Sequence, residues 1–193
     1  MKRAVIVTFD QFTDIDIFLS WDLLNRIKLH GKEFEVSIVG TKSSHRSVSG
    51  IDLKTHGFVE ECNNADLVFF GSGPGTRNLI KDDDYLARFK LNPATQIICS
   101  MCSGVLIIAA LGLLNGMSAT TYPTTFELLR AYGVDVIEDK HLVTNGKIGT
   151  AAGCLAAVDL MGWAIEKLYD HKIRESVIAS VLPVGQSTYA FPD

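Results

Sequence analysis

Two cysteines, Cys99 and Cys102, stand three residues apart in the stretch "ICSMCSGV", between two apolar runs. A C-x-x-C pair exchanges disulfides when both thiols are exposed at a helix N-terminus. The alternative is a nucleophile elbow: the strand-like "QIICSM" ends, the chain turns at Cys102, and a helix begins with the small residues Ser103 and Gly104. We favour the elbow, with Cys99 as a buried strand residue and with the helix N-terminus lowering the pKa of Cys102. Two inert core cysteines are the third interpretation.

The remaining cysteines, Cys62 and Cys154, stand alone in the sequence without paired spacing. A structural zinc site needs about four ligands, and no such set is visible. We therefore expect both residues to be structural and expect no metal site.

A glycine-rich stretch, "GSGPG" at residues 71–75, follows a buried strand pattern. It lacks the Lys-Ser/Thr of a phosphate-binding loop and the spacing of a dinucleotide fingerprint. A plain turn is one interpretation. An oxyanion hole is the other, if Cys102 lies nearby, because glycine lets backbone N–H groups approach a developing negative charge.

Asp16 has two possible roles. It follows Thr13 by three residues, which is the spacing of a capping box at a helix start. Placed beside Cys102, it would instead donate and accept a proton. No histidine lies where a Cys–His dyad would easily form; all five are expected at surface positions, namely His30, His45, His56, His141 and His171.

The elements that must position these residues alternate between strand-like and helix-like patterns. Uninterrupted apolar strands are expected at 3–9, 33–40, 66–71 and 96–101, separated by helices, with hairpins around Gly50 and at Asn145–Gly146. Such a chain predicts a parallel sheet covered by helices on both faces, with a site beyond the carboxyl ends of the strands. Three segments should meet there, residues 10–16, 71–76 and 101–104.

The composition is that of an ordinary globular chain of 193 residues, 47% hydrophobic, with a net charge of −4. A single domain over 1–193 is expected at this length. The acidic balance and the lack of a basic run argue against nucleic-acid binding. The longest apolar run, "GVLIIAALGLL", is too short to cross a membrane, and no signal peptide is visible. We expect a cytoplasmic protein.

Over nearly its full length the chain resembles the ThiJ/PfpI superfamily, within the class I glutamine amidotransferase-like fold. The resemblance is carried by "AVIVTFDQFTDIDIFLSWDLL", the glycine-rich loop, "CSGVLIIAALGLLNGMSATTY" and "LVTNGKIGTAAGCLAAVDL". Within the superfamily it is most similar to the isonitrile hydratase branch, which has Asp in the first helix and a small hydroxyl residue after the cysteine. Many members carry His where this chain has Tyr122 in "ATTYPTT".

The resemblance implies a flavodoxin-like α/β fold, a homodimer and a site for a small-molecule substrate. It places the nucleophile at Cys102, the acid at Asp16 and the oxyanion glycine at Gly73. Ser103 would contribute its hydroxyl and its amide, and Ser72 and Tyr122 would bind the substrate. The implied reaction is addition of water to an isonitrile through a thioimidate on Cys102, giving an N-substituted formamide. This implied reaction needs no organic cofactor. The alternatives are an amidase or peptidase, a glyoxalase or deglycase-like enzyme, and a stress sensor that works by oxidation of Cys102.

Overall fold

A seven-stranded sheet forms the centre of the computed structural model, which describes residues 1–186. The last seven positions of the expected domain 1–193 lie outside the described residues. The strands are ordered β10-β11-β7-β6-β1-β2-β5. Their bounds are β1 Lys2–Val7, β2 Phe34–Gly40, β5 Gly57–Phe58, β6 Leu67–Phe70, β7 Ile97–Met101, β10 Leu142–Asn145 and β11 Ile148–Ala151.

The predicted parallel sheet is confirmed, with one exception at its edge. Every pairing from β11 to β5 is parallel, whereas β10 pairs antiparallel with β11. The exception is the predicted hairpin: Asn145 pairs with Ile148, and Gly146 supplies a φ of +59° between them. The predicted excursion around Gly50 is also a hairpin, formed by β3 (Ser44–Arg46) and β4 (Asp52–Lys54).

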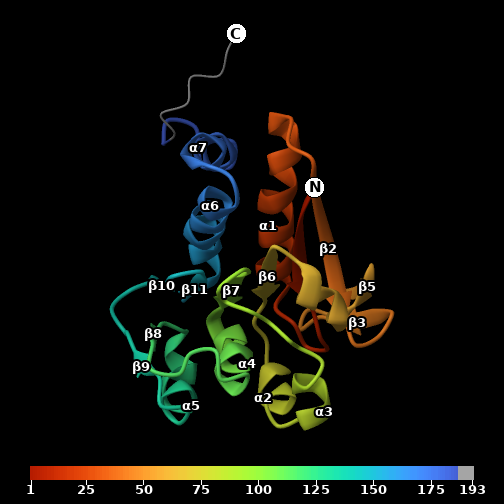
Figure 1. Cartoon of the computed structure of the whole chain (residues 1–193), viewed down its shortest axis with the longest axis vertical. Helices are drawn as coiled ribbons and strands as arrows, with labels where there is room; N and C mark the ends of the chain where they lie inside the picture. Colours follow the sequence, from red (N-terminus) through yellow and green to blue (C-terminus); the bar gives the residue numbers. More distant parts are fainter. Residues whose placement is uncertain (187–193) are drawn as a thin grey trace.

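Helices cover both faces of the sheet (Figure 1). On one side lie α1, α6 and α7, with α1 packed on α6 and α6 on α7. On the other side lie α2, α3, α4 and α5. The bounds are α1 Asp14–Asn25, α2 Thr76–Leu79, α3 Asp83–Leu86, α4 Val105–Ala110, α5 Phe126–Arg130, α6 Ala157–Leu168 and α7 His171–Ala179. No helix in residues 1–186 has the length and apolar character needed to span a membrane.

The central strands are largely apolar because both of their faces are covered. All residues of β6 and β7 are buried, and Phe69 and Phe70 have no exposed surface. Each such side chain contributes about 1.5–3 kcal/mol through burial. The core therefore holds rigidly the strand ends from which the site is built.

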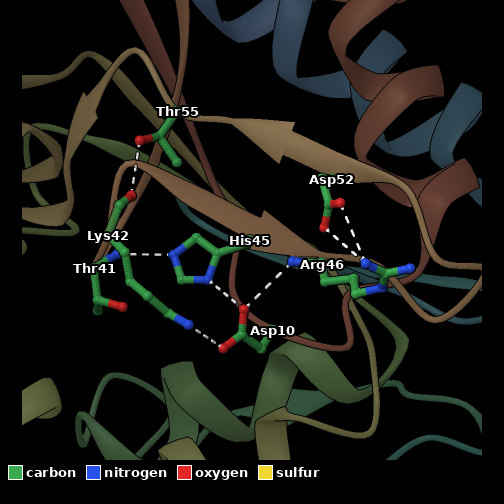
Figure 2. Close-up of polar contacts among 7 residues, drawn as sticks. All are labelled: Asp10, Thr41, Lys42, His45, Arg46, Asp52 and Thr55. Atoms are coloured by element: carbon green, nitrogen blue, oxygen red, sulfur yellow. Dashed lines mark hydrogen bonds and ion pairs between the residues drawn. The ribbon is translucent and has the colours of Figure 1, made fainter.

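A polar cluster around His45, which is buried and not at the surface as expected, positions the segment between β1 and α1 (Figure 2). Asp10 accepts hydrogen bonds from His45 Nδ1 at 3.0 Å and from the Arg46 amide at 3.3 Å, and it also pairs with Lys42. The Thr41 amide donates to His45 Nε2 at 3.2 Å, so Nδ1 carries the ring proton. Burial lowers the pKa of His45, which keeps the ring neutral. Residues 10–13 are thereby held against the β3 hairpin.

Trp21, in α1, is half-buried and stacks on His56 with ring centroids 5.2 Å apart. This contact packs α1 against the segment that precedes β5.

Candidate active site

The turn after β7 has the geometry of a nucleophile elbow. Cys102 has a φ of +45°, and apart from Gln11 it is the only residue other than glycine with positive φ among residues 1–186. Strained backbone of this kind persists where the surrounding structure enforces it and is typical of functional positions. Thr121 Oγ1 donates to the Cys102 carbonyl at 2.8 Å. A Cβ on Gly104 would lie 2.5 Å from the Phe70 carbonyl oxygen, so only glycine allows this approach.

The two cysteines of the "CSMC" stretch have different environments. Cys99 lies within β7 and has no exposed surface, and burial raises its pKa far above the ordinary value. Cys102 reaches the surface of a cavity. A redox pair with two exposed thiols is therefore excluded, and the elbow interpretation is supported by the backbone.

Asp16 points into the site and does not cap its helix. It is fully buried, and its Oδ2 accepts a hydrogen bond from the Ser72 amide at 3.1 Å. One carboxylate oxygen lies within 4.8 Å of the sulfurs of both Cys102 and Cys154. Thr13 is the N-cap of α1 by backbone conformation but makes no side-chain capping hydrogen bond. The capping-box interpretation is wrong because the carboxylate is held by the glycine-rich loop instead.

The glycine-rich loop lies against the segment before α1. Ser72 is joined to Thr13 twice: the Thr13 amide donates to its carbonyl at 2.7 Å, and the two hydroxyls are 3.1 Å apart. Gly73 has a φ of +155°, and a Cβ there would lie 2.1 Å from the Gln11 carbonyl oxygen. The loop is therefore more than a plain turn, because its backbone packs closely against the segment that precedes α1.

The amide of Gly73 already has a partner. It donates to Ser103 Oγ at 3.1 Å, and the same hydroxyl lies 3.2 Å from the Gly73 carbonyl. In this structure the Gly73 amide is therefore not a free oxyanion donor, and the Ser103 hydroxyl is occupied as well. A substrate would have to displace this pair before either group could bind it.

A cavity of about 230 Å³ opens above Cys102. This volume is below the roughly 300–1,000 Å³ of pockets for drug-sized ligands, so only a compact molecule would fit. The three segments predicted to meet do so here, joined by others from further along the chain. The lining residues are Thr13, Ser72, Gly73, Pro74, Arg77, Cys102, Ser103, Tyr122, Thr124, Thr125 and Cys154.

The electrostatics of Cys102 differ from the expectation. Burial, and after it the negative charge of Asp16, raise the pKa of the Cys102 thiol to about 12, although an N–H from Gly153 at 3.3 Å acts in the opposite direction. The expected lowering by a helix N-terminus is wrong, because desolvation outweighs the dipole of the short 3-10 turn Cys102–Gly104. A base must take the thiol proton before the sulfur can attack.

Cys154 belongs to the site, and the expectation that it is only structural is wrong. It is half-buried, lines the cavity and follows β11 at the carboxyl edge of the sheet. Burial and the charge of Asp16 raise its pKa to about 11. The hairpin pattern at Asn145–Gly146 predicts that the strand after it ends near "TAAG". The next residue, Cys154, would then lie at the carboxyl edge of the sheet. Cys62, in contrast, is fully buried in the core as expected.

Arg77 and Tyr122 form part of the cavity wall. Arg77, at the start of α2, lines it and was not singled out from the sequence. Tyr122 lines it too and is 50% exposed. None of the lining residues is a histidine. His141 pairs instead with Asp159 at 2.8 Å.

A parallel α/β sheet, a cysteine at a strained elbow and a buried carboxyl group beside it define a class of cysteine-elbow proteins. The sequence model of the DJ-1/PfpI family matches residues 2–167 of this chain. The chain belongs to this family.

Individual relatives agree with this assignment. The chain is 31% identical over 114 residues to an isonitrile hydratase of Pseudomonas putida, a match that covers 58% of this chain and 50% of that protein. The aligned part thus spans about half the length of that relative.

Solved structures show the same fold. A ThiJ/PfpI family protein of Pseudomonas syringae has a TM-score of 0.83 at 21% identity, covering 97% of this chain and 78% of that one. Drosophila melanogaster DJ-1beta has a TM-score of 0.80 at 18% identity, covering 93% and 97%. The flavodoxin-like α/β arrangement predicted from the sequence is confirmed.

Proposed function

We propose that the protein hydrates isonitriles, using Cys102 as nucleophile and Asp16 as the proton donor and acceptor. The observation that carries this proposal is the buried Asp16 carboxylate within 4.8 Å of the Cys102 sulfur, at a residue free of any capping role. The similarity to an isonitrile hydratase supports the choice of substrate.

The first half of the reaction forms a bond to sulfur. The Asp16 carboxylate takes the proton of the Cys102 thiol, and the thiolate attacks the terminal isonitrile carbon. As the carbon–sulfur bond forms, one π pair of the carbon–nitrogen triple bond moves onto nitrogen. The carbon keeps its own lone pair, which takes the proton back from the Asp16 carboxyl group. The product is a thioimidate, R–N=CH–S–Cys102, and Asp16 is again ionised.

The second half releases the product. Asp16 takes a proton from a water molecule as the water oxygen attacks the thioimidate carbon, and it passes that proton to the nitrogen. In the tetrahedral intermediate, R–NH–CH(OH)–S–Cys102, Asp16 then takes the hydroxyl proton as the carbonyl forms and the carbon–sulfur bond breaks, and it returns this proton to the departing thiolate. An isonitrile and one water have become an N-substituted formamide, with no change of oxidation state that would need a cofactor.

The remaining predicted residues have supporting roles in this proposal. Ser72 orients Asp16 through its amide. Ser103 and Gly73 would separate from each other to stabilise charge that develops on the substrate nitrogen or on the attacking water. Tyr122 would contact the substituent of the isonitrile at the mouth of the cavity.

The proposal is tested by incubating the protein with simple alkyl isonitriles, cyclohexyl isocyanide among them, and measuring formamide by mass spectrometry. The expected result is a formamide yield that rises with protein concentration. No formamide over a broad panel would contradict the choice of substrate while leaving the elbow in place.

The alternatives are weaker on the geometry. An amidase or peptidase of the cysteine–histidine type needs an imidazole that takes the thiol proton and returns it to the leaving amine, and no histidine lines the cavity. An oxidation sensor works best with a thiolate at neutral pH, whereas the pKa of Cys102 is raised to about 12. A glyoxalase-like activity would be recognised by lactate formed from methylglyoxal.

The family resemblance also leads us to propose a homodimer. Helix α1 leaves Ile15 43% and Phe18 37% exposed, which suits contact with a second copy. Light scattering should then give twice the chain mass of 21.1 kDa; a monomer at micromolar concentration would contradict the dimer.

A further inference from the structure

The proposed hydration leaves one feature of the site without a role, the thiol of Cys154. This residue lies 52 positions after Cys102 in the chain, yet the two sulfurs and a carboxylate oxygen of Asp16 all lie within 4.8 Å of one another. Two thiols that line one cavity, with a carboxyl group buried beside them, are more groups than a site with one nucleophile and one acid needs. Their chemistry points to a ligand that all three groups can share.

The donor atoms are held as metal ligands usually are. Asp16 has no exposed surface, and its Oδ1 has no hydrogen-bond partner among the described residues, so a buried acceptor is left unsatisfied at the site. Its Oδ2 is oriented by the Ser72 amide, and the Cys102 sulfur is oriented by the Gly153 amide. Such outer hydrogen bonds orient ligands in metal centres.

The spacing is compatible with tetrahedral coordination. Zinc binds thiolate sulfur at about 2.3 Å and carboxylate oxygen at about 2.0–2.2 Å, which places neighbouring ligand atoms roughly 3.5–3.8 Å apart. The three groups here already lie within 4.8 Å of each other, and side-chain rotation closes the difference. Both cysteines also line the cavity, so a fourth position remains accessible to water.

We propose that Asp16, Cys102 and Cys154 together bind a thiophilic divalent metal ion, of which Zn²⁺ is the representative. Two sulfur donors favour such an ion over Mg²⁺ or Ca²⁺, which prefer oxygen ligands. The ion displaces the protons of the two thiols, and two thiolates and a carboxylate offset its charge. Because it uses Cys102 and Asp16, the bound ion excludes the isonitrile, so the metal inhibits the proposed reaction.

The test measures binding directly, without a substrate. The full chain is reduced, treated with a chelator and desalted without oxygen, and Zn²⁺ is then titrated against a chromogenic competitor. We expect one ion per wild-type chain. Cys154→Ala should weaken binding by at least about tenfold, a loss of about 1.4 kcal/mol. Cys62→Ala is the matched control, because Cys62 lies buried in the core away from the site, and it should bind as the wild type does.

A spectroscopic readout counts the thiolates. With Co²⁺ at saturation, sulfur-to-cobalt charge-transfer absorption should be present in the wild type and fall by about half in Cys154→Ala. In Asp16→Asn the affinity should fall while this absorption persists, which tests the carboxylate even if a cysteine variant folds poorly.

Three results would overturn the proposal: wild-type protein that fails to compete for Zn²⁺, Cys154→Ala that binds as tightly as the wild type, or equal losses in Cys154→Ala and Cys62→Ala. Because no isonitrile is present, failure of the metal site and failure of the hydratase assignment are separate outcomes.

Discussion

Replacing Cys102 by alanine is expected to reduce formamide production by at least about 10³-fold, to the rate seen without protein. The reason is that the proposed thioimidate is attached to this sulfur. The measurement is the initial rate of formamide formation from an alkyl isonitrile, with the variant and the wild type at equal concentration.

The matched control is Cys99→Ala, three residues earlier in the same strand. Its thiol is fully buried in β7 and does not line the cavity, so the variant should keep its activity if it folds. Formation of formamide at the wild-type rate by Cys102→Ala would show that the chemistry lies elsewhere.

Replacing Asp16 by asparagine is expected to have opposite effects on two properties of the site. Hydration should fall by about 10²- to 10⁴-fold, since the amide neither accepts the thiol proton nor donates one to carbon. The pKa of Cys102 should fall below its wild-type value of about 12, since a negative charge that opposes the thiolate has been removed. Alkylation of Cys102 by iodoacetamide at a given pH should therefore become faster.

These two measurements distinguish proton transfer by Asp16 from a purely electrostatic effect of Asp16 on the Cys102 thiol. If Asp16 only adjusted the thiol, faster alkylation would be accompanied by unchanged or faster hydration, and the proposed mechanism would be wrong. Asp14→Asn is the matched control: it removes the same charge two residues earlier in α1, from a side chain that does not line the cavity. It should leave both rates near those of the wild type.

The sheet and the elbow could be predicted because they depend on local patterns. Buried parallel strands need long apolar runs such as "DLVFF" and "QIICSM", and the helices between them show a different period. The small residues Ser103 and Gly104 predict a tight strand-to-helix turn, and the position of glycine follows from the approach of the Phe70 carbonyl. The parallel arrangement then placed residues 10–16, 71–76 and 101–104 at one edge.

The parts of the site that were missed depend on contacts between distant segments. Whether Asp16 caps α1 or faces Cys102 is decided by the Ser72 amide, 56 residues away. The pairing of Gly73 with Ser103 depends on how closely two loops approach. The pKa of Cys102 depends on how completely the elbow is covered. No periodicity or motif in the sequence indicates any of these long-range contacts.

Cys154 shows how an isolated residue can be misjudged. On its own it has the features of a core cysteine, since free cysteines are mostly buried and inert. Its place after the end of β11 becomes informative only once β11 is known to pair with β7, the strand that leads to Cys102. Long-range strand order was therefore the missing information.

The roles proposed for Cys102 and Asp16 meet in a single covalent intermediate, which can be observed directly. The protein is mixed with an alkyl isonitrile, quenched in acid within its first turnovers and digested, and the peptides are analysed by mass spectrometry. We predict an adduct of the mass of the isonitrile on the peptide that contains Cys102, at the Cys102 sulfur, with none on Cys99 or Cys154. Steady formamide production with no adduct on Cys102 at any time would contradict it.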